Sequence, residues 1–324
     1  MDSQRIHMEA HIHCRGFSLV ELMVALVITL ILLAGIGQIF LSSKKSYTLQ
    51  DSLARMQENG RYAMDTLSQD LRRAGYWGGN ADITEIGGTL PLLNEDGICL
   101  GSGNNDWARK LDRKIFGLND NRTNYGCLPS TTLPSQDVLM VRFAAPWRVG
   151  GITTPTFQND HFYLRSSLFE GKLFKGSDEA SNPITAAAVT TSELVARVYF
   201  INPATNAGTN KCGGGTVPSL YRLGLANGVP TVEEVAYGVE GLQVQYGIDT
   251  TNDDSVDSYV NAAGPTDPMW DQVISVRIWL LVRAECPDTG YINDTAYSMG
   301  GTNTTFNDSY RRKLYTSTVR LRNR

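Results

Sequence analysis

The amino-acid sequence predicts an α+β protein in which a long N-terminal α-helix packs on an antiparallel β-sheet domain with long loop insertions. Three observations support this fold class. An apolar segment lies near the N-terminus, a stretch with helical periodicity follows it directly, and the remainder consists of short β-prone runs separated by turn-forming residues. We therefore divide the 324 residues into segments 1–16, 17–75 and 76–324.

The apolar segment runs from Gly16 to Leu41 and contains one charged residue, Glu21. A helix rises about 1.5 Å per residue, so residues 17–41 are long enough to cross a hydrocarbon layer of roughly 30 Å. A secretory signal peptide would have a shorter apolar core followed by a small-residue cleavage site, which is absent here. A plain signal anchor explains the length but not Glu21, because an ionisable group in such a span costs roughly 2 to 4 kcal/mol.

The helix is predicted to continue beyond the apolar segment. Apolar or small residues recur every three or four positions, as one face of an amphipathic helix requires. They are Leu49, Leu53, Met56, Gly60, Ala63, Leu67, Leu71 and Ala74. Glycines at 75, 78 and 79 end the pattern, so we expect one helix with a transmembrane half and an amphipathic half. A separate coiled coil is the alternative, but the stretch is short for one.

The remaining residues predict a β-rich domain. Short runs of Val, Leu, Ile, Tyr and Phe alternate with Gly, Asn, Asp, Thr and Ser, which is typical of strands and turns. The candidate strands are Val138 to Ala144, Phe162 to Arg165, Leu194 to Ile201, Leu220 to Leu225, Val239 to Ile248, Val273 to Arg283 and Leu314 to Arg322. Residues 76–136 and 285–309 are predicted to be loop-rich insertions. Because sheet and helix each have an apolar face to bury, they are expected to pack together.

Residues 16 to 21 read G-F-S-L-V-E and directly precede the apolar run from Leu22 to Leu41. This motif resembles the class III signal of type IV prepilins and pseudopilins. The resemblance implies that a prepilin peptidase removes the cytoplasmic leader 1–16 by cutting after Gly16, and that the new N-terminal residue, Phe17, is methylated. It also implies that Glu21 is the assembly carboxylate, which neutralises an N-terminal amine when helices stack in a filament.

Segments in the C-terminal part extend the resemblance to the PilW-like minor pilins of type IV pili. They are G-V-E-G-L-Q-V-Q-Y at 238–246, W-D-Q-V-I-S-V-R-I-W-L-L-V-R at 270–283 and Y-R-R-K-L-Y-T-S-T-V-R-L-R-N at 310–323. Residues 58–78, near the end of the predicted helix, also resemble that family. The resemblance implies a pilin-like fold and a structural protein, not an enzyme, that takes part in priming, assembly and tip structure of the pilus. It would thereby support twitching motility and adhesion.

The same resemblance implies partners and a location. The expected partners are other minor pilins, the major pilin, the prepilin peptidase, the inner-membrane pilus assembly platform and a tip adhesin. Before assembly the chain would cross the inner membrane once, with its globular domain in the periplasm, and afterwards it would lie in the extracellular pilus fibre at the tip. A minor pseudopilin of a type II secretion system is the alternative, and a membrane-anchored periplasmic enzyme or binding protein is a second one.

Enzyme signatures are missing from the sequence, and no cofactor is expected to be required. There is no G-x-S-x-G motif and no Walker loop. His161 is predicted to be a solvated or packed residue at a strand end, with a general base as the alternative. The net charge of −4 argues against nucleic acid as a partner. A solvent-facing basic set on and beside the last strand is predicted from Arg311, Arg312, Lys313, Arg320, Arg322 and Arg324, with a DNA contact as the alternative.

The cysteines indicate an exported domain. The chain has five, and Cys14 lies in the leader, which leaves Cys99, Cys127, Cys212 and Cys286. An even number is typical of disulfides in an oxidising compartment. Three pairings are open, and we favour Cys99 with Cys127 and Cys212 with Cys286, because the first pair is closest in sequence and encloses one loop. A zinc site is the alternative, but no C-x-x-C spacing occurs.

One loop carries oxygen ligands at a spacing that resembles a calcium loop. Asp249, Thr251, Asp253 and Asp257 fall at positions 1, 3, 5 and 9, which makes calcium the one candidate cofactor. The pattern departs from that of relatives, because Thr251 stands at the acidic third position and Asp254 at the turn glycine. Val260 also replaces the bidentate Glu. The alternative is an acidic hairpin loop without a metal.

Overall fold

The computed structural model describes residues 16, 18–79, 82–90, 106–120, 128, 135–145, 156–185, 188–203, 216–264 and 267–323. The chain divides into two compact units, Met1–Asp51 and Ser52–Arg324, and each is described by itself. Helix α1 (Leu19–Arg73) has 55 residues and contributes to both units. The predicted continuation of the helix to about Ala74 is therefore confirmed.

The described part of the first unit is the N-terminal half of α1. Its apolar side chains, from Leu19 to Leu41, are exposed. The helix is long and apolar enough to cross a membrane, judged by length and composition. Glu21 lies in the first turn, where a negative charge interacts favourably with the helix dipole.

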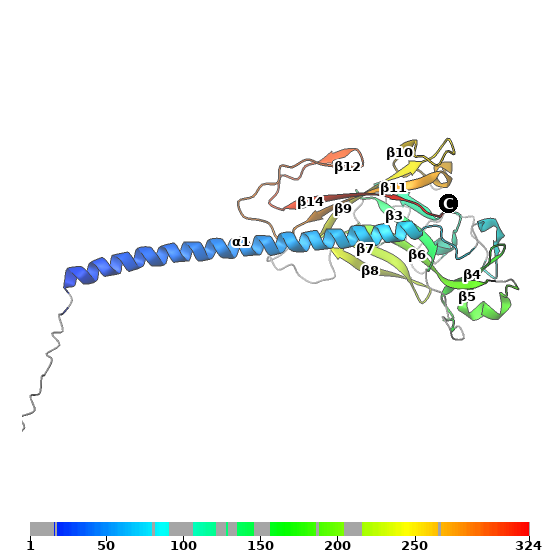
Figure 1. Ribbon diagram of the computed structural model, residues 1–324, viewed down its shortest axis with the longest axis horizontal. Helices are drawn as coiled ribbons and strands as arrows, with labels where there is room; N and C mark the ends of the chain where they lie inside the picture. The colour runs from blue at the N-terminus through cyan, green and yellow to red at the C-terminus, as the bar shows by residue number, and fades with distance from the viewer. Residues whose placement is uncertain are drawn as a thin grey trace, which may run out of the picture. The chain divides into compact units, whose positions relative to one another are not determined.

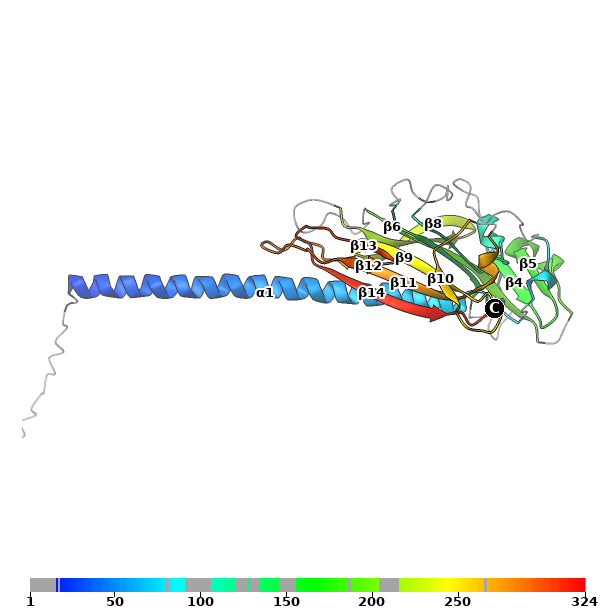
Figure 2. The ribbon, with the colours of Figure 1, turned by 90° about the horizontal axis from the view of Figure 1, so that it is seen from above.

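The described residues of the second unit form two larger sheets and a small hairpin (Figures 1 and 2). The first sheet has eight strands, in which β1, β5, β4, β6, β3 and β2 follow one another, while β7 pairs with β6 and with β8. Its members are β1 (Ile86–Gly87), β2 (Ile115–Leu118), β3 (Val138–Ala144), β4 (Phe162–Ser166), β5 (Gly171–Lys175), β6 (Thr190–Asn202), β7 (Ser219–Ala226) and β8 (Val229–Tyr237). Apart from the parallel pair β1 and β5, its pairs are antiparallel.

The second sheet is antiparallel and has the order β10, β9, β11, β14. Its strands are β9 (Val239–Ile248), β10 (Ser258–Val260), β11 (Val273–Arg283) and β14 (Arg312–Arg320). Strands β12 (Tyr297–Met299) and β13 (Thr302–Thr304) form the separate hairpin. Short 3₁₀ segments lie at Ile83–Glu85, Asp106–Arg109, Gly176–Ser181 and Pro268–Asp271.

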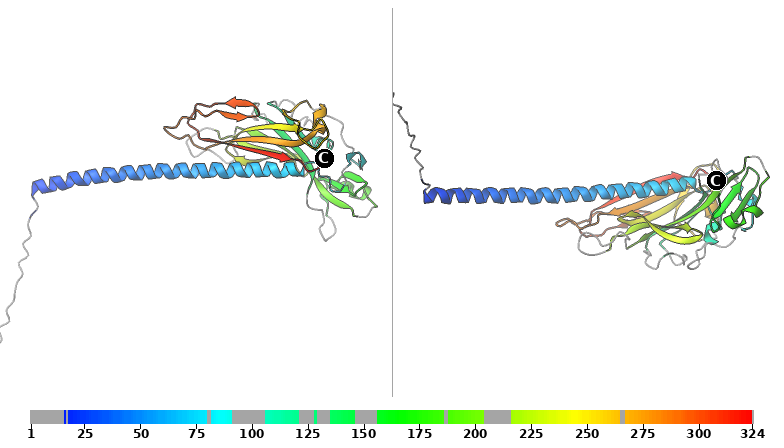
Figure 3. Two further views of the ribbon diagram at one scale, coloured as in Figure 1. Left: turned by 45° about the horizontal axis from the view of Figure 1, so that its top comes forward. Right: turned by 90° about the horizontal axis from the view of Figure 1, so that it is seen from below.

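The second half of α1 packs on the domain through the face that the sequence predicts. Its buried residues include Met56, Ala63, Leu67 and Leu71, which join one core cluster with strands of both larger sheets. Strand β14 lies beside this half of the helix in both views of Figure 3. Gly60 makes the close approach possible, because a Cβ atom at that position would collide with the ring of Tyr315 in β14.

The two larger sheets meet over an aromatic cluster. The ring of Trp270 lies 4.9 Å from that of Phe116 in β2 and 4.9 Å from that of Tyr246 in β9. Gly117 in β2 faces Tyr246 so closely that a Cβ atom there would overlap the phenol oxygen. A glycine is therefore required where β2 crosses β9, because interiors packed at crystal-like density leave no room for an added methyl group.

The structure confirms the predicted α+β fold class. All seven candidate strands are present, as β3, β4, β6, β7, β9, β11 and β14, although β14 begins at Arg312 and ends at Arg320. The prediction of loop-rich insertions was incomplete, because residues 76–136 also hold β1 and β2, and residues 285–309 hold the hairpin β12–β13. These strands have two to four residues, so they are too short to show an alternating pattern.

Candidate functional site

The predicted processing and assembly residues lie at the start of α1. Gly16 is described and exposed, whereas Phe17 lies outside the described residues. Glu21 is exposed on the first turn of the helix. Cleavage after Gly16, methylation of Phe17 and the assembly role of Glu21 stay predictions.

Asp70 attaches α1 to the first sheet through a buried carboxylate. Both of its oxygens accept hydrogen bonds from Nη1 of Arg197, at 2.7 and 2.8 Å, and Oδ2 also accepts one from the hydroxyl of Tyr199 at 2.5 Å. The side chain of Asp70 is 2% exposed and that of Arg197 is 22% exposed. Burial, followed by the adjacent Asp70 charge, raises the pKa of Tyr199, so the hydroxyl remains a donor.

The end of the chain covers the C-terminal end of the same helix. The amide of Asn323 donates hydrogen bonds to the carbonyl oxygens of Arg73 at 3.4 Å and Ala74 at 3.3 Å. Asn59, earlier on α1, donates to the carbonyl oxygen of Tyr237 at 2.9 Å. The two bonds of Asn323 satisfy carbonyl groups that a helix end leaves without intrahelical partners and hold this residue against α1, whereas the bond of Asn59 ties the helix to β8.

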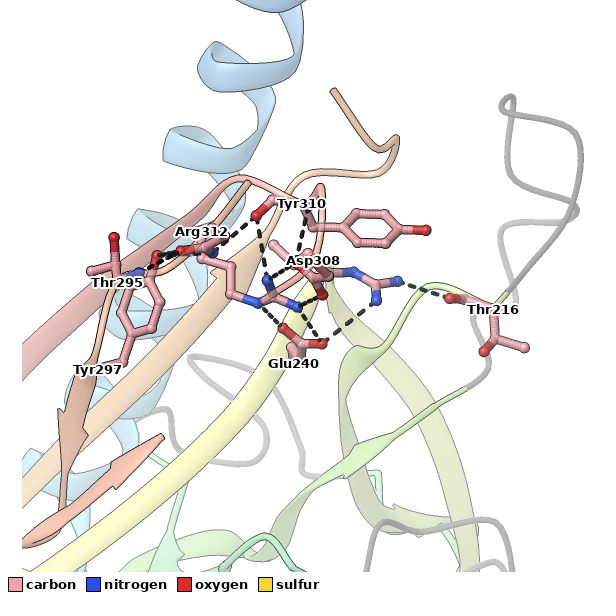
Figure 4. A network of polar contacts seen from close by, with 9 residues as sticks. Thr216, Glu240, Thr295, Tyr297, Asp308, Tyr310 and Arg312 are labelled. Atoms are coloured by element: carbon pink, nitrogen blue, oxygen red, sulfur yellow. Dashed lines mark hydrogen bonds and ion pairs between the residues drawn. The ribbon is translucent and has the colours of Figure 1, made fainter. Parts of the chain in front are cut away.

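Arg312 is the centre of a polar network at the start of β14 (Figure 4). Its guanidinium donates to Glu240 Oε2 at 2.6 Å and to the two oxygens of Asp308 at 2.6 and 2.7 Å. Its side chain is 1% exposed and lies over the ring of Phe306, with 3.7 Å from Cζ to the ring centroid. The prediction that Arg312 belongs to a solvent-facing basic set is therefore wrong, because two carboxylates and an aromatic ring enclose it.

A second arginine extends this network. Arg283 in β11 lies 3.5 Å from Glu240 Oε1 and donates to the carbonyl oxygen of Thr216 at 2.9 Å. Its guanidinium also lies 4.2 Å from the ring centroid of Tyr310. The hydrogen bond from Arg312 is the main cause that lowers the pKa of Asp308, so this carboxylate stays ionised. The network connects strands β9, β11 and β14 with the segment that precedes β14.

His161 lies next to β4 and has partners on both ring nitrogens. Nδ1 is 2.7 Å from Oε1 of Glu193 in β6, and Nε2 is 2.9 Å from Oδ1 of Asn227. Burial lowers the pKa of His161, but the hydrogen bonds to Asn227 and Glu193 outweigh it and raise the pKa overall. Each ring nitrogen thus has an oxygen partner, which fits the predicted packed histidine at a strand end.

The first acidic residue of the predicted calcium loop is engaged by the loop's own backbone. Oδ1 of Asp249 accepts from the N–H groups of Asn252 at 2.7 Å and Asp253 at 3.2 Å, and Oδ2 accepts from that of Asp254 at 2.9 Å. Asn252 and Asp254 have positive φ angles of 62° and 68°, a conformation that Asn and Asp tolerate better than most residues. The loop therefore turns tightly around the Asp249 carboxylate.

Asp257 closes the other end of this loop. Its Oδ2 accepts from the N–H groups of Thr250 at 2.7 Å and Thr251 at 3.1 Å. The side-chain hydrogen bond from Thr250 is the first cause that lowers the pKa of Asp257. Within the described residues, no group of three or more His, Cys, Asp or Glu side chains is arranged to hold a metal ion. The geometry fits a hydrogen-bonded acidic loop better than a metal site, and calcium binding stays a prediction that a titration tests.

Of the four predicted disulfide cysteines, Cys286 lies in the described part of the chain, and it is disulfide-bonded. Cys99, Cys127 and Cys212 lie outside the described residues. The favoured pairing, Cys99 with Cys127 and Cys212 with Cys286, therefore stays a prediction.

The sequence did not point to two buried charged groups that position structural elements. Arg142 in β3 donates through Nε to the carbonyl oxygen of Trp107 at 2.8 Å, and it is fully buried. Asp137, just before β3, accepts from the N–H of Val244 at 2.7 Å and of Asp120 at 3.0 Å. Burial raises the pKa of Asp137 to about 7. A single ionisable residue within or directly before an apolar run was the available signal, but only the folded structure shows the partners.

Two family models match the chain in segments that carry the sequence resemblance. The type IV pilus-assembly protein W family model matches residues 198–323, and the prokaryotic N-terminal methylation motif matches residues 12–37. Among solved structures, a type IV-like pilin from Thermus thermophilus is 13% identical with a TM-score of 0.32, and the alignment covers 84% of this chain and 96% of that chain. No curated protein matches the chain significantly.

The two matched regions coincide with the segments that the motifs single out. The methylation motif spans Gly16, Phe17 and Glu21, and the PilW match runs from within β6 to beyond β14, including the network around Arg312. Both matches support a type IV pilin role, and the methylation motif also supports a membrane-anchored N-terminal segment. The chain thus matches the prokaryotic N-terminal methylation motif near its N-terminus and the type IV pilus-assembly protein W family over its C-terminal part.

Proposed function

We propose that this chain is a minor pilin that takes part in priming and assembly of type IV pili and in the structure of the pilus tip. The observation that carries the proposal is the presence of both a methylation motif at residues 12–37 and a PilW match at residues 198–323. The motif provides the means of membrane insertion and processing, and the C-terminal match relates the globular domain to pilus assembly. The protein acts as a structural component, without catalysis.

In this mechanism the N-terminal half of α1 anchors the chain in the inner membrane, with unit Ser52–Arg324 in the periplasm. The prepilin peptidase cuts after Gly16 and leaves an amine at Phe17. The assembly platform then extracts the helix into a bundle with the helices of the major pilin and other minor pilins. Glu21 pairs there with an N-terminal amine, and the globular domain is displayed at the tip, beside a tip adhesin.

Glu21 provides the decisive test, because a charge in an apolar bundle is tolerated only when it is paired. We expect Glu21→Ala to leave membrane insertion and cleavage after Gly16 intact, but to remove the chain from sheared pili. Glu58→Ala is the matched control, since Glu58 is an exposed carboxylate later on the same helix. Immunoblots of membrane and pilus fractions measure both effects, and normal incorporation of the Glu21 variant would contradict the proposal.

Co-purification identifies the assembly to which the chain belongs. Under the proposal, the cross-linked full chain is recovered with minor pilins and the major pilin. Recovery with pseudopilins of a type II secretion system would instead favour that assembly. Loss of surface pili and twitching motility on deletion of the gene, restored by the wild-type chain, is the corresponding expectation in cells.

A further inference from the structure

An open groove lies beside the last residues of β14. It has a volume of about 820 Å³ and is lined by Arg72 of α1, Asp254 of the acidic loop and residues 318–322. All of these belong to the unit Ser52–Arg324. The groove therefore follows the chain for several consecutive residues instead of forming a compact cavity, which suits an extended ligand better than a small molecule.

The groove coincides with a sheet edge. Strand β14 is the last in its sheet and pairs with β11, and no strand of the described residues pairs with its other edge. Leu321 donates to the carbonyl oxygen of Ile274 at 2.9 Å, and Ser275 Oγ donates to that of Val319 at 3.3 Å, so Val319 and Leu321 direct their backbone groups toward β11. In an antiparallel ladder this direction alternates along the strand. The peptide groups of Thr318 and Arg320 therefore face away from β11.

The charged residues that line the groove are mainly positive. Arg72, Arg320 and Arg322 are exposed, and Asp254 is the one acidic residue that lines the groove. Arg320 donates to the backbone carbonyl oxygen of Asp254 at 2.8 Å. This bond does not pair the positive charge of Arg320 with a carboxylate. Within the described residues, carboxylates pair with other arginines instead, namely Arg73, Arg113, Arg165, Arg197, Arg222, Arg283, Arg311 and Arg312.

We propose that this groove binds an extended acidic peptide segment, which adds to the free edge of β14 as a further strand and sets its carboxylates against Arg72, Arg320 and Arg322. In strand addition, backbone hydrogen bonds supply affinity and side-chain contacts supply selectivity. A phosphodiester backbone would use the arginines but not the peptide groups of Thr318 and Arg320, so the geometry favours a peptide. That the ligand is an acidic peptide follows from the groove itself. Only the further step, that the peptide comes from a neighbouring pilus subunit, rests on the proposed function.

The test uses the full processed chain in detergent micelles and fluorescence anisotropy. The probe is a labelled peptide of alternating threonine and glutamate. Three comparison probes are the same peptide with lysine for glutamate, the acidic peptide with an N-methyl group at every residue, and a single-stranded oligonucleotide of equal charge. N-methylation preserves the carboxylates but removes the N–H groups that a strand needs for pairing. We expect the unmodified acidic peptide to bind and the other three to bind much more weakly.

Charge reversal locates the binding site. We expect Arg72→Glu combined with Arg322→Glu to weaken binding of the acidic peptide on the order of tenfold, from lost attraction and added repulsion. Arg61→Glu is the matched control, because Arg61 is an exposed arginine on the same helix that does not line the groove. Arg322→Gln, which removes charge without reversing it, should have a smaller effect. Because these residues are exposed, unchanged tryptophan fluorescence confirms that each variant is folded.

Three results would overturn the proposal: absent binding of the acidic peptide, equal binding of its N-methylated form, or equal loss of affinity in the Arg61 variant. Stronger binding of the oligonucleotide would instead assign the groove to nucleic acid. The assay measures peptide binding by the isolated chain, so its result does not depend on pilus assembly. If the Glu21 test failed, a pilus subunit would no longer be the expected source of the peptide, but the peptide-binding site would still stand. If the peptide-binding test failed, the Glu21 result would be unaffected.

Discussion

The carboxylate of Asp70 is expected to contribute strongly to the stability of the unit Ser52–Arg324. It is the acceptor for Arg197 and Tyr199 of β6, and it comes from the last turn of α1. Asp70→Asn keeps the size of the side chain but removes its charge and one of its two acceptor oxygens. With its oxygen in the place of Oδ2, the amide can still accept from both partners, but its N–H₂ group then takes the place of Oδ1 and faces Nη1 of Arg197.

The magnitude follows from the burial of the three groups. Breaking a fully buried ion pair costs about 3 to 5 kcal/mol. Arg197 is 22% exposed, so water can recover part of its solvation, which lowers that cost. The hydroxyl of Tyr199 is fully buried and keeps an acceptor, but its hydrogen bond loses the charge of that acceptor, which costs about 1 kcal/mol. We expect Asp70→Asn to reduce the free energy of unfolding by about 3 kcal/mol.

Urea unfolding of the full chain in detergent micelles measures this effect through tryptophan fluorescence. All five tryptophans lie beyond Ser52, at positions 77, 107, 147, 270 and 279, so the signal reports on this unit. Asp65→Asn is the matched control, because Asp65 is an exposed carboxylate on the same helix that accepts one hydrogen bond from Gln69. We expect that control to change the free energy of unfolding by less than about 0.5 kcal/mol.

A double-mutant cycle tests whether the loss arises from the named contacts. Combining Asp70→Asn with Arg197→Met should cost less than the sum of the two single losses, with a coupling energy of about 1 to 3 kcal/mol. The reasoning would be refuted if the Asp70 variant were as stable as the Asp65 control, or if the two losses added without coupling.

Two further predictions concern the core and the pH dependence. Gly117→Ala should destabilise the unit by about 1 to 3 kcal/mol, because the added methyl group meets the phenol of Tyr246, whereas Gly87→Ala meets open space and should be nearly neutral in the same urea assay. The pKa values of Asp137 and His161 are both raised in the fold, so their stabilising effect is present at low pH and is lost as the pH rises. The urea concentration at the midpoint of unfolding should therefore decrease as the pH is raised from about 5 to about 8. An increase of this concentration over the same pH range would contradict the assignment.

The elements that the sequence predicts well are those with a long, one-sided pattern. Helix α1 carries an apolar run and then an apolar stripe, and strands such as β9 and β11 are ten and eleven residues long. The predicted bounds of β9 and β11 match the structure. In such segments local preference and burial favour the same conformation, so the pattern is sufficient.

Strand β8 shows why other elements escaped prediction. Its sequence, V-P-T-V-E-E-V-A-Y, contains a proline and two adjacent glutamates, which weaken a strand pattern. Among the strands of the described residues it pairs with β7 alone, so an edge position tolerates Pro230. Glu233 pairs with Arg222 of β7, a partner that lies eleven residues earlier. Pairing with a neighbour, and not the local pattern, determines this strand.

The basic residues near the C-terminus show that the sequence likewise cannot predict which charged side chains of the candidate site are paired. Arg311, Arg312 and Lys313 are adjacent in sequence, but the first pairs with Asp288, the second is buried between Asp308 and Glu240, and the third is exposed. Sequence predicts the location of positive charge, but alternation along a strand sends neighbours to opposite faces. Which charges are neutralised depends on segments that are distant in the chain.

The carboxylates at the two ends of α1 illustrate how one helix serves two environments. Asp70 lies in the last turn, where Arg197 and Tyr199 of the same unit balance the cost of its burial. Glu21 lies in the first turn, exposed among apolar side chains, a situation that is favourable in water but costly in hydrocarbon. Under the proposed function, the amine of a processed neighbour removes that cost. Asp70 then stabilises the fold of one subunit, whereas Glu21 makes the stability of the helix depend on the next subunit.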